Sequence, residues 1–141
     1  MFESVGTLHY EIGNSYKLIV RIDQAISDYY RSLIPKWIPN NPQAYPAHIS
    51  VVRKEIPPNL QYWGKYEGHR ITFWYDPIIH QSALYFWLNV YCLQLESIRT
   101  ELGLPVHSPY TLPPEGFNKV FHTTIANKKG LQSAETGYNQ V

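Results

Sequence analysis

Residues 46–51 read PAHISV, and residues 120–125 read VFHTTI. Both stretches share one pattern, in which a histidine follows an apolar residue and is itself followed, two positions later, by Ser or Thr. The surrounding apolar residues favour strands. Side chains at positions i and i+2 of a strand point to the same side, so we expect His48 beside Ser50 and His122 beside Thr124.

Two such strands facing each other across a cleft would bring two imidazoles and two hydroxyls to one place. The two histidines are 74 residues apart, about half of the chain, which favours one motif in each half of the molecule. One imidazole would take a proton from a nucleophile and the other would protonate a leaving oxygen, while the hydroxyls hold phosphate oxygens. The pattern therefore predicts phosphoryl chemistry without a metal, with four catalytic residues: His48, Ser50, His122 and Thr124.

A third match to the pattern, HQS at residues 80–82, stands in a different context. It follows Asp76 and Pro77 and has a polar middle residue, so we interpret it as the turn between two strands. The alternative for each motif taken alone is a structural histidine, held by hydrogen bonds in its strand.

Composition limits the class of protein. A chain of 141 residues predicts one domain, and a formal net charge of +1 argues against a protein that grips long nucleic acid, though not against a small anionic ligand. The single Cys92 excludes an intrachain disulfide and suits a reducing compartment. No metal-ligand cluster, signal peptide or membrane-spanning stretch is visible, so we expect a cytoplasmic monomer that uses no cofactor.

Hydrophobic periodicity and turn residues predict six strands and two helices. Asp23 caps the first helix and Gly103 ends the second, while prolines place long loops at residues 36–45 and 104–117. The predicted strands cover residues 6–12, 16–22, 47–53, 68–75, 83–91 and 119–127, and the helices cover residues 24–34 and 93–102. Each half runs from a hairpin through a helix to a motif strand, which indicates an α+β fold with antiparallel sheets and a cleft between two lobes.

The paired motifs resemble those of the two-histidine (2H, LigT-like) phosphoesterase superfamily. More narrowly, the chain resembles the anti-CBASS cyclic-oligonucleotide nucleases of tailed phages, through residues 16–20 (YKLIV), 46–52 (PAHISVV), 71–77 (ITFWYDP) and 121–127 (FHTTIAN). The resemblance implies a bilobal fold with helices flanking the sheets. It also implies metal-independent hydrolysis of 3′–5′ linkages in cyclic di- and trinucleotides such as cyclic GMP–AMP, in the cytoplasm of an infected bacterium.

The same resemblance implies aromatic residues that sandwich a base, for which we select Tyr16 and Trp74, with Trp87 and Tyr75 as substitutes. Residues 131–141 are either a frayed end or a lid that closes over the nucleotide and offers it Glu135 or Tyr138.

Three alternative functions remain open from the sequence. The protein could process 2′,3′-cyclic phosphate ends of RNA, sequester nucleotides without cleaving them, or carry the motifs by chance as an interaction protein.

Overall fold

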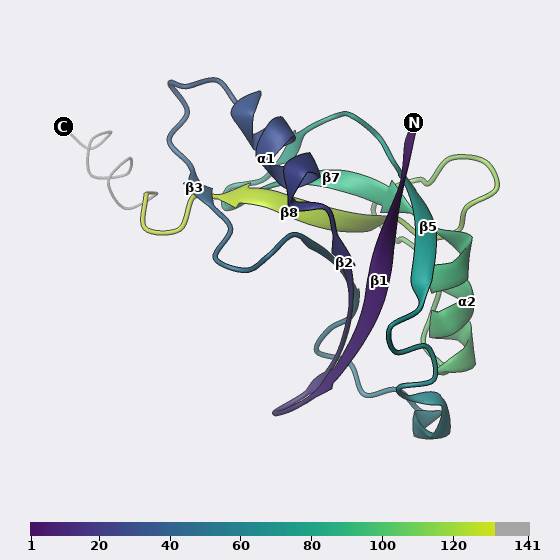
Figure 1. The fold of residues 1–141 in the computed structure, drawn as a ribbon. Helices are drawn as coiled ribbons and strands as arrows, with labels where there is room; N and C mark the ends of the chain where they lie inside the picture. Colours follow the sequence, from purple (N-terminus) through teal and green to yellow (C-terminus); the bar gives the residue numbers. More distant parts are fainter. Residues whose placement is uncertain (132–141) are drawn as a thin grey trace.

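The computed structural model describes residues 1–131 and shows an α+β fold in which two α-helices accompany a curled antiparallel sheet (Figure 1). Residues 132–141, including Glu135 and Tyr138, lie outside the described part, and so does nearly all of the predicted lid. No helix among the described residues is long and apolar enough to cross a membrane.

Most of the elements expected from the sequence are present, with somewhat different ends. Asp23 caps the first helix by accepting a hydrogen bond from the Ala25 amide, and Gly103, at a φ of 83°, follows the end of the second. The elements are β1 (Phe2–Ile12), β2 (Tyr16–Ile22), α1 (Gln24–Ser32), β3 (Asn41–Pro42), β4 (His48–Val52), the 3₁₀ helix η1 (Leu60–Tyr62), β5 (Arg70–Tyr75), β6 (His80–Gln81), β7 (Tyr85–Tyr91), α2 (Leu93–Glu101) and β8 (Phe121–Asn127).

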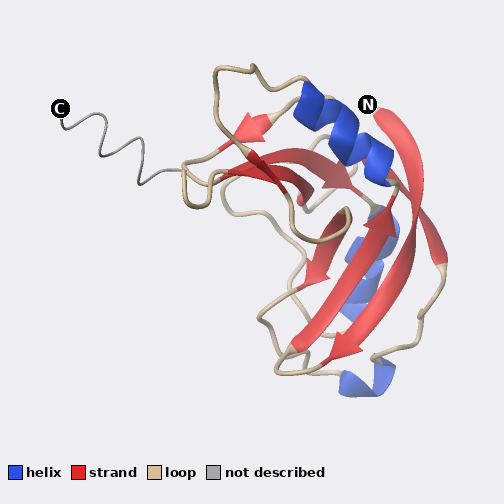
Figure 2. Ribbon diagram, turned by 60° about the vertical axis from the view of Figure 1, so that its left-hand side comes forward, coloured by secondary structure: helices blue, strands red, loops and turns tan. Residues whose placement is uncertain are grey.

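The strands form one sheet in the order β3-β8-β7-β5-β1-β2-β4, with β6 paired to β7, and not the separate sheets that the sequence suggested. Its two parts, β4-β2-β1-β5 and β7-β8-β3, are joined through β5 and β7 by only two residue pairs, Trp74 with Tyr91 and Tyr75 with Val90. So short a junction lets the sheet bend sharply, and the two parts face each other in Figure 2. The bend brings the motif strands β4 and β8 into contact.

Strand alternation separates a core face from a pocket face. In β4 the side chains of Ile49 and Val51 are buried in the core, while those of His48 and Ser50 point the other way. The same alternation in β8 buries Phe121, Thr123 and Ile125. The predicted pairing of each motif histidine with its hydroxyl residue on one side of the strand is therefore confirmed.

Each helix packs on the part of the sheet that does not immediately precede it. The α1 residue Tyr30 packs with Phe86 and Leu88 of β7 and with Ile125 of β8, although α1 follows β2. Leu95 and Ile98 of α2 join the core of β1, β2, β4 and β5, although α2 follows β7. The two sequence halves are therefore not two independent packing units.

Two short strands form where the sequence predicted a loop and a turn. Residues 41 and 42 form β3 on the edge of β8, and His80 and Gln81 form β6 on β7. Only Ser82 occupies the turn predicted for residues 80–82, where its hydroxyl accepts hydrogen bonds from the amides of Leu84 and Tyr85. Two-residue strands carry too little periodicity to be predicted from sequence.

Candidate active site

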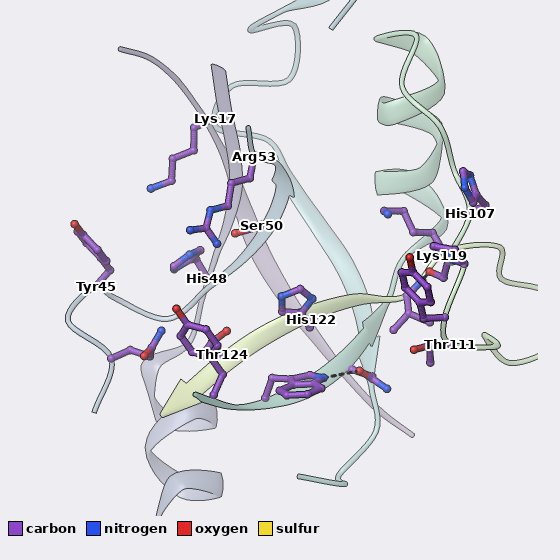
Figure 3. A pocket seen from close by; sticks show the side chains of 18 of the residues that line it. Lys17, Tyr45, His48, Ser50, Arg53, His107, Thr111, Lys119, His122 and Thr124 are labelled. Carbon is purple, nitrogen blue, oxygen red and sulfur yellow. Dashed lines mark hydrogen bonds between the residues drawn. The ribbon is translucent and has the colours of Figure 1, made fainter. Parts of the chain in front are cut away.

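The four residues predicted from the two motifs all line one pocket of about 570 Å³. His48 and Ser50 reach it from β4, and His122 and Thr124 reach it from β8 (Figure 3). This volume lies within the range of roughly 300–1,000 Å³ that small-molecule sites occupy. Residues that are far apart in the sequence thus meet because the sheet curls.

A backbone carbonyl two residues before His48 fixes the orientation and the tautomer of its ring. Its Nδ1 lies 2.8 Å from the carbonyl oxygen of Pro46, which only accepts hydrogen bonds, so Nδ1 carries the proton. In the neutral ring Nε2 is therefore an unprotonated acceptor. This leaves His48 equipped to take a proton from a ligand.

His122 has a different electrostatic environment. Its side chain is exposed to the pocket, but nearby protein atoms partly desolvate the ring and lower its pKa below the ordinary histidine value. The positive charges of Lys119 and Arg53 lower that pKa further, and His48 adds a smaller effect. No hydrogen bond within residues 1–131 holds its ring nitrogens, so both are available to a ligand.

The pocket is cationic, which the near-zero net charge of the chain conceals. It is lined by Lys17, Arg53, Lys119 and Lys129 in addition to the histidines, and no Asp or Glu of the described residues lines it. A concave surface that carries charges of one sign attracts a ligand of the opposite sign. These four residues were not predicted from the sequence, although Arg53 and Lys119 flank the two motif strands and so lie close in sequence to the histidines.

Aromatic and amide groups of β7 form another wall of the pocket. Trp87 Nε1 donates to Asn89 Oδ1 at 3.1 Å, and Asn89 Nδ2 donates to Nε2 of His80 at 3.2 Å. The His80 ring stacks on Trp87 at 5.8 Å between centroids. Trp87 also meets the His122 ring edge-on at 6.5 Å. His80 thus has a structural place behind the wall, and its side chain does not line the pocket.

The two aromatic residues selected for base stacking, Tyr16 and Trp74, do not line this pocket. Tyr16 packs edge-on against Trp63, with 5.1 Å between the ring centroids. Trp74 lies on β5, which β7 separates from the pocket strand β8 in the sheet. Of the two named substitutes, Trp87 lines the pocket and Tyr75 does not, since Tyr75 packs with both core clusters. Further rings at the pocket belong to Tyr45, Tyr85 and Tyr110.

The loop between α2 and β8 forms one rim of the pocket through residues 107–111. It is tied down by Ser108, whose hydroxyl accepts a hydrogen bond from the Val120 amide at 2.7 Å. Tyr110 at its tip is 98% exposed, so its ring makes almost no contact with the rest of the protein and is free to contact a ligand.

Within residues 1–131, no three side chains of His, Cys, Asp or Glu are grouped so that they could hold a metal ion. Neither a protein-family model, nor a curated protein, nor a solved structure matches the chain.

Proposed function

We propose that this protein is a metal-independent phosphodiesterase that hydrolyses 3′–5′ linkages of cyclic di- and trinucleotides. The observation that carries the proposal is the meeting of His48 and His122, from strands at distant points of the sequence, in one pocket with cationic walls. Two imidazoles supply both proton transfers of a phosphodiester cleavage, and the cations suit its anionic substrate.

In the first step, His48 Nε2 takes the proton from the ribose 2′-hydroxyl next to the scissile phosphate. The 2′-oxygen bonds to phosphorus, the bond from phosphorus to the 5′-oxygen breaks, and protonated His122 gives its proton to that departing oxygen. The product is a 2′,3′-cyclic phosphate and a free 5′-hydroxyl. Water then opens the cyclic phosphate with the proton roles reversed, which leaves a terminal monophosphate.

The fixed tautomer of His48 supports its assignment as the first base, because its neutral ring presents a lone pair at Nε2. The lowered pKa of His122 makes its protonated form a stronger acid toward the leaving oxygen. A bound phosphate also offsets the positive charges of Arg53 and Lys119, which favours the protonated ring when substrate is present. Ser50 and Thr124 hold the phosphate oxygens with their hydroxyls.

The nucleotide class and the biological role come from the resemblance of the motifs to phage anti-CBASS nucleases. The pocket adds aromatic surfaces at Trp87, Tyr85, Tyr45 and Tyr110, on which bases stack without strong sequence preference. On this proposal the protein removes the cyclic-nucleotide signal of bacterial antiphage defence in the cytoplasm of the infected host.

The test is turnover of a panel of cyclic di- and trinucleotides in EDTA, with 2′,3′-cyclic phosphate-ended RNA in a parallel reaction. We expect cleavage of the cyclic panel through a 2′,3′-cyclic phosphate intermediate, and no cleavage when the scissile step carries a 2′-O-methyl group. Activity that disappears in EDTA and returns with a divalent ion would contradict the mechanism. Cleavage of RNA ends alone would replace the substrate class, and tight binding without cleavage would indicate a sequestering protein.

A further inference from the structure

Lys119 stands on the opposite side of the pocket from the residues of β4. It precedes β8, and its side chain extends into the pocket while that of Arg53 enters from the other side, with His122 between them (Figure 3). Both cations act on the His122 ring electrostatically. The pocket therefore offers positive charge on two sides of His122, whereas the reaction at one phosphate uses the side shared with His48 and Ser50.

The Lys119 ammonium has no carboxylate partner among the ion pairs of residues 1–131. Its acidic neighbours are committed elsewhere. Glu55 accepts two hydrogen bonds from Arg99, at 2.8 and 2.9 Å, and Glu96 accepts two from Asn118, at 3.1 and 2.9 Å.

The ammonium is also partly withdrawn from water and lies over the Phe121 ring at 5.5 Å. Burial lowers the pKa of Lys119 below its ordinary value, and the positive charge of Arg99 lowers it further. The carboxylates of Glu55 and Glu96 favour the charged form of Lys119 from a distance but form no ion pair with it. A partly desolvated cation without a directly paired carboxylate gains more from binding an anion than a fully hydrated surface lysine does.

We propose that Lys119 is the anion-binding group of a second phosphate subsite, which receives the phosphate on the far side of the ribose whose linkage is cleaved. This inference rests on the proposed function, since that function places the first phosphate between His48 and His122. Successive phosphates of a 3′–5′ linked nucleotide flank one ribose, just as the two cationic sides flank His122. The subsite selects ligands with two neighbouring phosphates over ligands with one, such as 2′,3′-cyclic mononucleotides.

The primary test measures binding and needs no catalysis. The probes are the 2′-deoxy cyclic di-AMP analogue, which lacks the attacking hydroxyl, and the same ring with one linkage replaced by a neutral methylphosphonate. Calorimetry on the wild type should show at least about tenfold tighter binding of the doubly charged ring. In Lys119→Met the two rings should bind within about threefold of each other. The matched control is Lys128→Met, because Lys128 follows β8 but does not line the pocket, and it should behave as wild type.

Equal affinity of the wild type for both rings would overturn the subsite, and so would an equal loss for both rings in Lys119→Met. Kinetics separate this result from the proposed function. If ribose cyclic di-AMP is cleaved, Lys119→Met should raise its KM at least about tenfold, a much larger factor than the change in KM for 2′,3′-cyclic AMP. Absence of cleavage in the wild type would refute the phosphodiesterase while the binding comparison still decides the subsite.

Discussion

Thr123 Oγ1 donates a hydrogen bond to the backbone carbonyl oxygen of His48 across 2.8 Å. The bond joins β8 to β4. In the sheet order β4 is the strand at one end, and β8 is the second strand from the other end. Thr123 itself is 1% exposed, so water does not compete for its hydroxyl. This buried contact links the two motif strands directly beneath the pocket.

Thr123→Val keeps the shape of the side chain and removes the donor. We expect the free energy of unfolding to fall by about 1 kcal/mol, the typical net value of such a bond. We also expect kcat to fall, because β4 and β8 are then free to separate and misplace the two imidazoles. Urea unfolding and steady-state kinetics measure the two effects. Thr7→Val, on an exposed position of β1, is the control; an identical response of both variants would show that the strand link has no special role.

His48→Ala and His122→Ala should each lower kcat by at least ~10² while the fold is retained, because each removes a proton carrier. Ser50→Ala and Thr124→Val should cost less. A substrate with sulfur in place of the bridging 5′-oxygen separates the two roles, because a thiolate leaves without a proton. It should restore much of the activity of His122→Ala and little of that of His48→Ala. Rescue of His48→Ala alone would exchange the assignments of base and acid.

The pKa of His122 provides a prediction on pH. In the ligand-free protein this residue should titrate below the ordinary value of about 6.5, because partial desolvation of the ring and the charges of Lys119 and Arg53 disfavour its protonated form. Lys119→Met removes one of those charges and should move the pKa upward, as should saturation with a non-cleavable phosphodiester. NMR titration of the imidazole protons measures both shifts, and a downward shift in either case would be inconsistent with the described electrostatics.

The lowered pKa of His122 also makes the stability of the fold depend on pH. Between the folded-state pKa of His122 and about 6.5, the unfolded chain binds more protons at this residue than the folded protein does. Protonation therefore favours unfolding, and the contribution of His122 to stability decreases as the pH falls through about 6.5. The stability difference between wild type and His122→Gln should accordingly shift in favour of the variant as the pH is lowered from about 7.5 to about 5.5 in urea titrations.

Arg99 of α2 is buried, and its hydrogen bonds join α2 to β4 and to the loop that leads to the pocket rim. It donates to Glu55, to the Val51 carbonyl in β4 and to the Pro105 carbonyl at the start of the rim loop. Arg99→Met should destabilise the protein by about 3 kcal/mol, because three sets of acceptors lose a buried partner. Thermal and urea unfolding measure this loss, and Arg70→Met, at an exposed position of β5, is the control.

The stability that the Arg99–Glu55 pair contributes depends on pH through Glu55. Hydrogen bonds from Arg99 hold the Glu55 pKa below its ordinary value, so the pair contributes its full stability above the ordinary glutamate pKa and loses it as the pH falls through the lowered folded-state pKa. Glu55→Gln should therefore be less stable than wild type near neutral pH, and the difference should shrink in acid. A difference that does not change with pH would mean that the pair contributes through shape alone.

The local pattern of the sequence was enough to predict which side chains share a face of each motif strand. Alternation in PAHISV and VFHTTI placed each histidine on the same side as its hydroxyl residue, and apolar periodicity located α1 and α2. These features depend on neighbours within a few positions, so the sequence itself carries them. The aromatic residues that line the pocket were harder to predict, because 12 Tyr and 4 Trp are distributed along the chain. Only their tertiary position separates rings in the core from rings at the pocket.

What the sequence determined alone is therefore the strand face on which each motif histidine and its hydroxyl residue stand. Tertiary structure decided that His48 and His122 share a pocket, that Arg53 and Lys119 flank it, and that Trp87 lines it where Tyr16 and Trp74 do not. It did so through the two-pair junction of β5 and β7 and the contact between Thr123 and His48. Such long-range pairings depend on how the whole sheet bends, because the free energy of packing distant strands is shared among many residues and leaves no local signature.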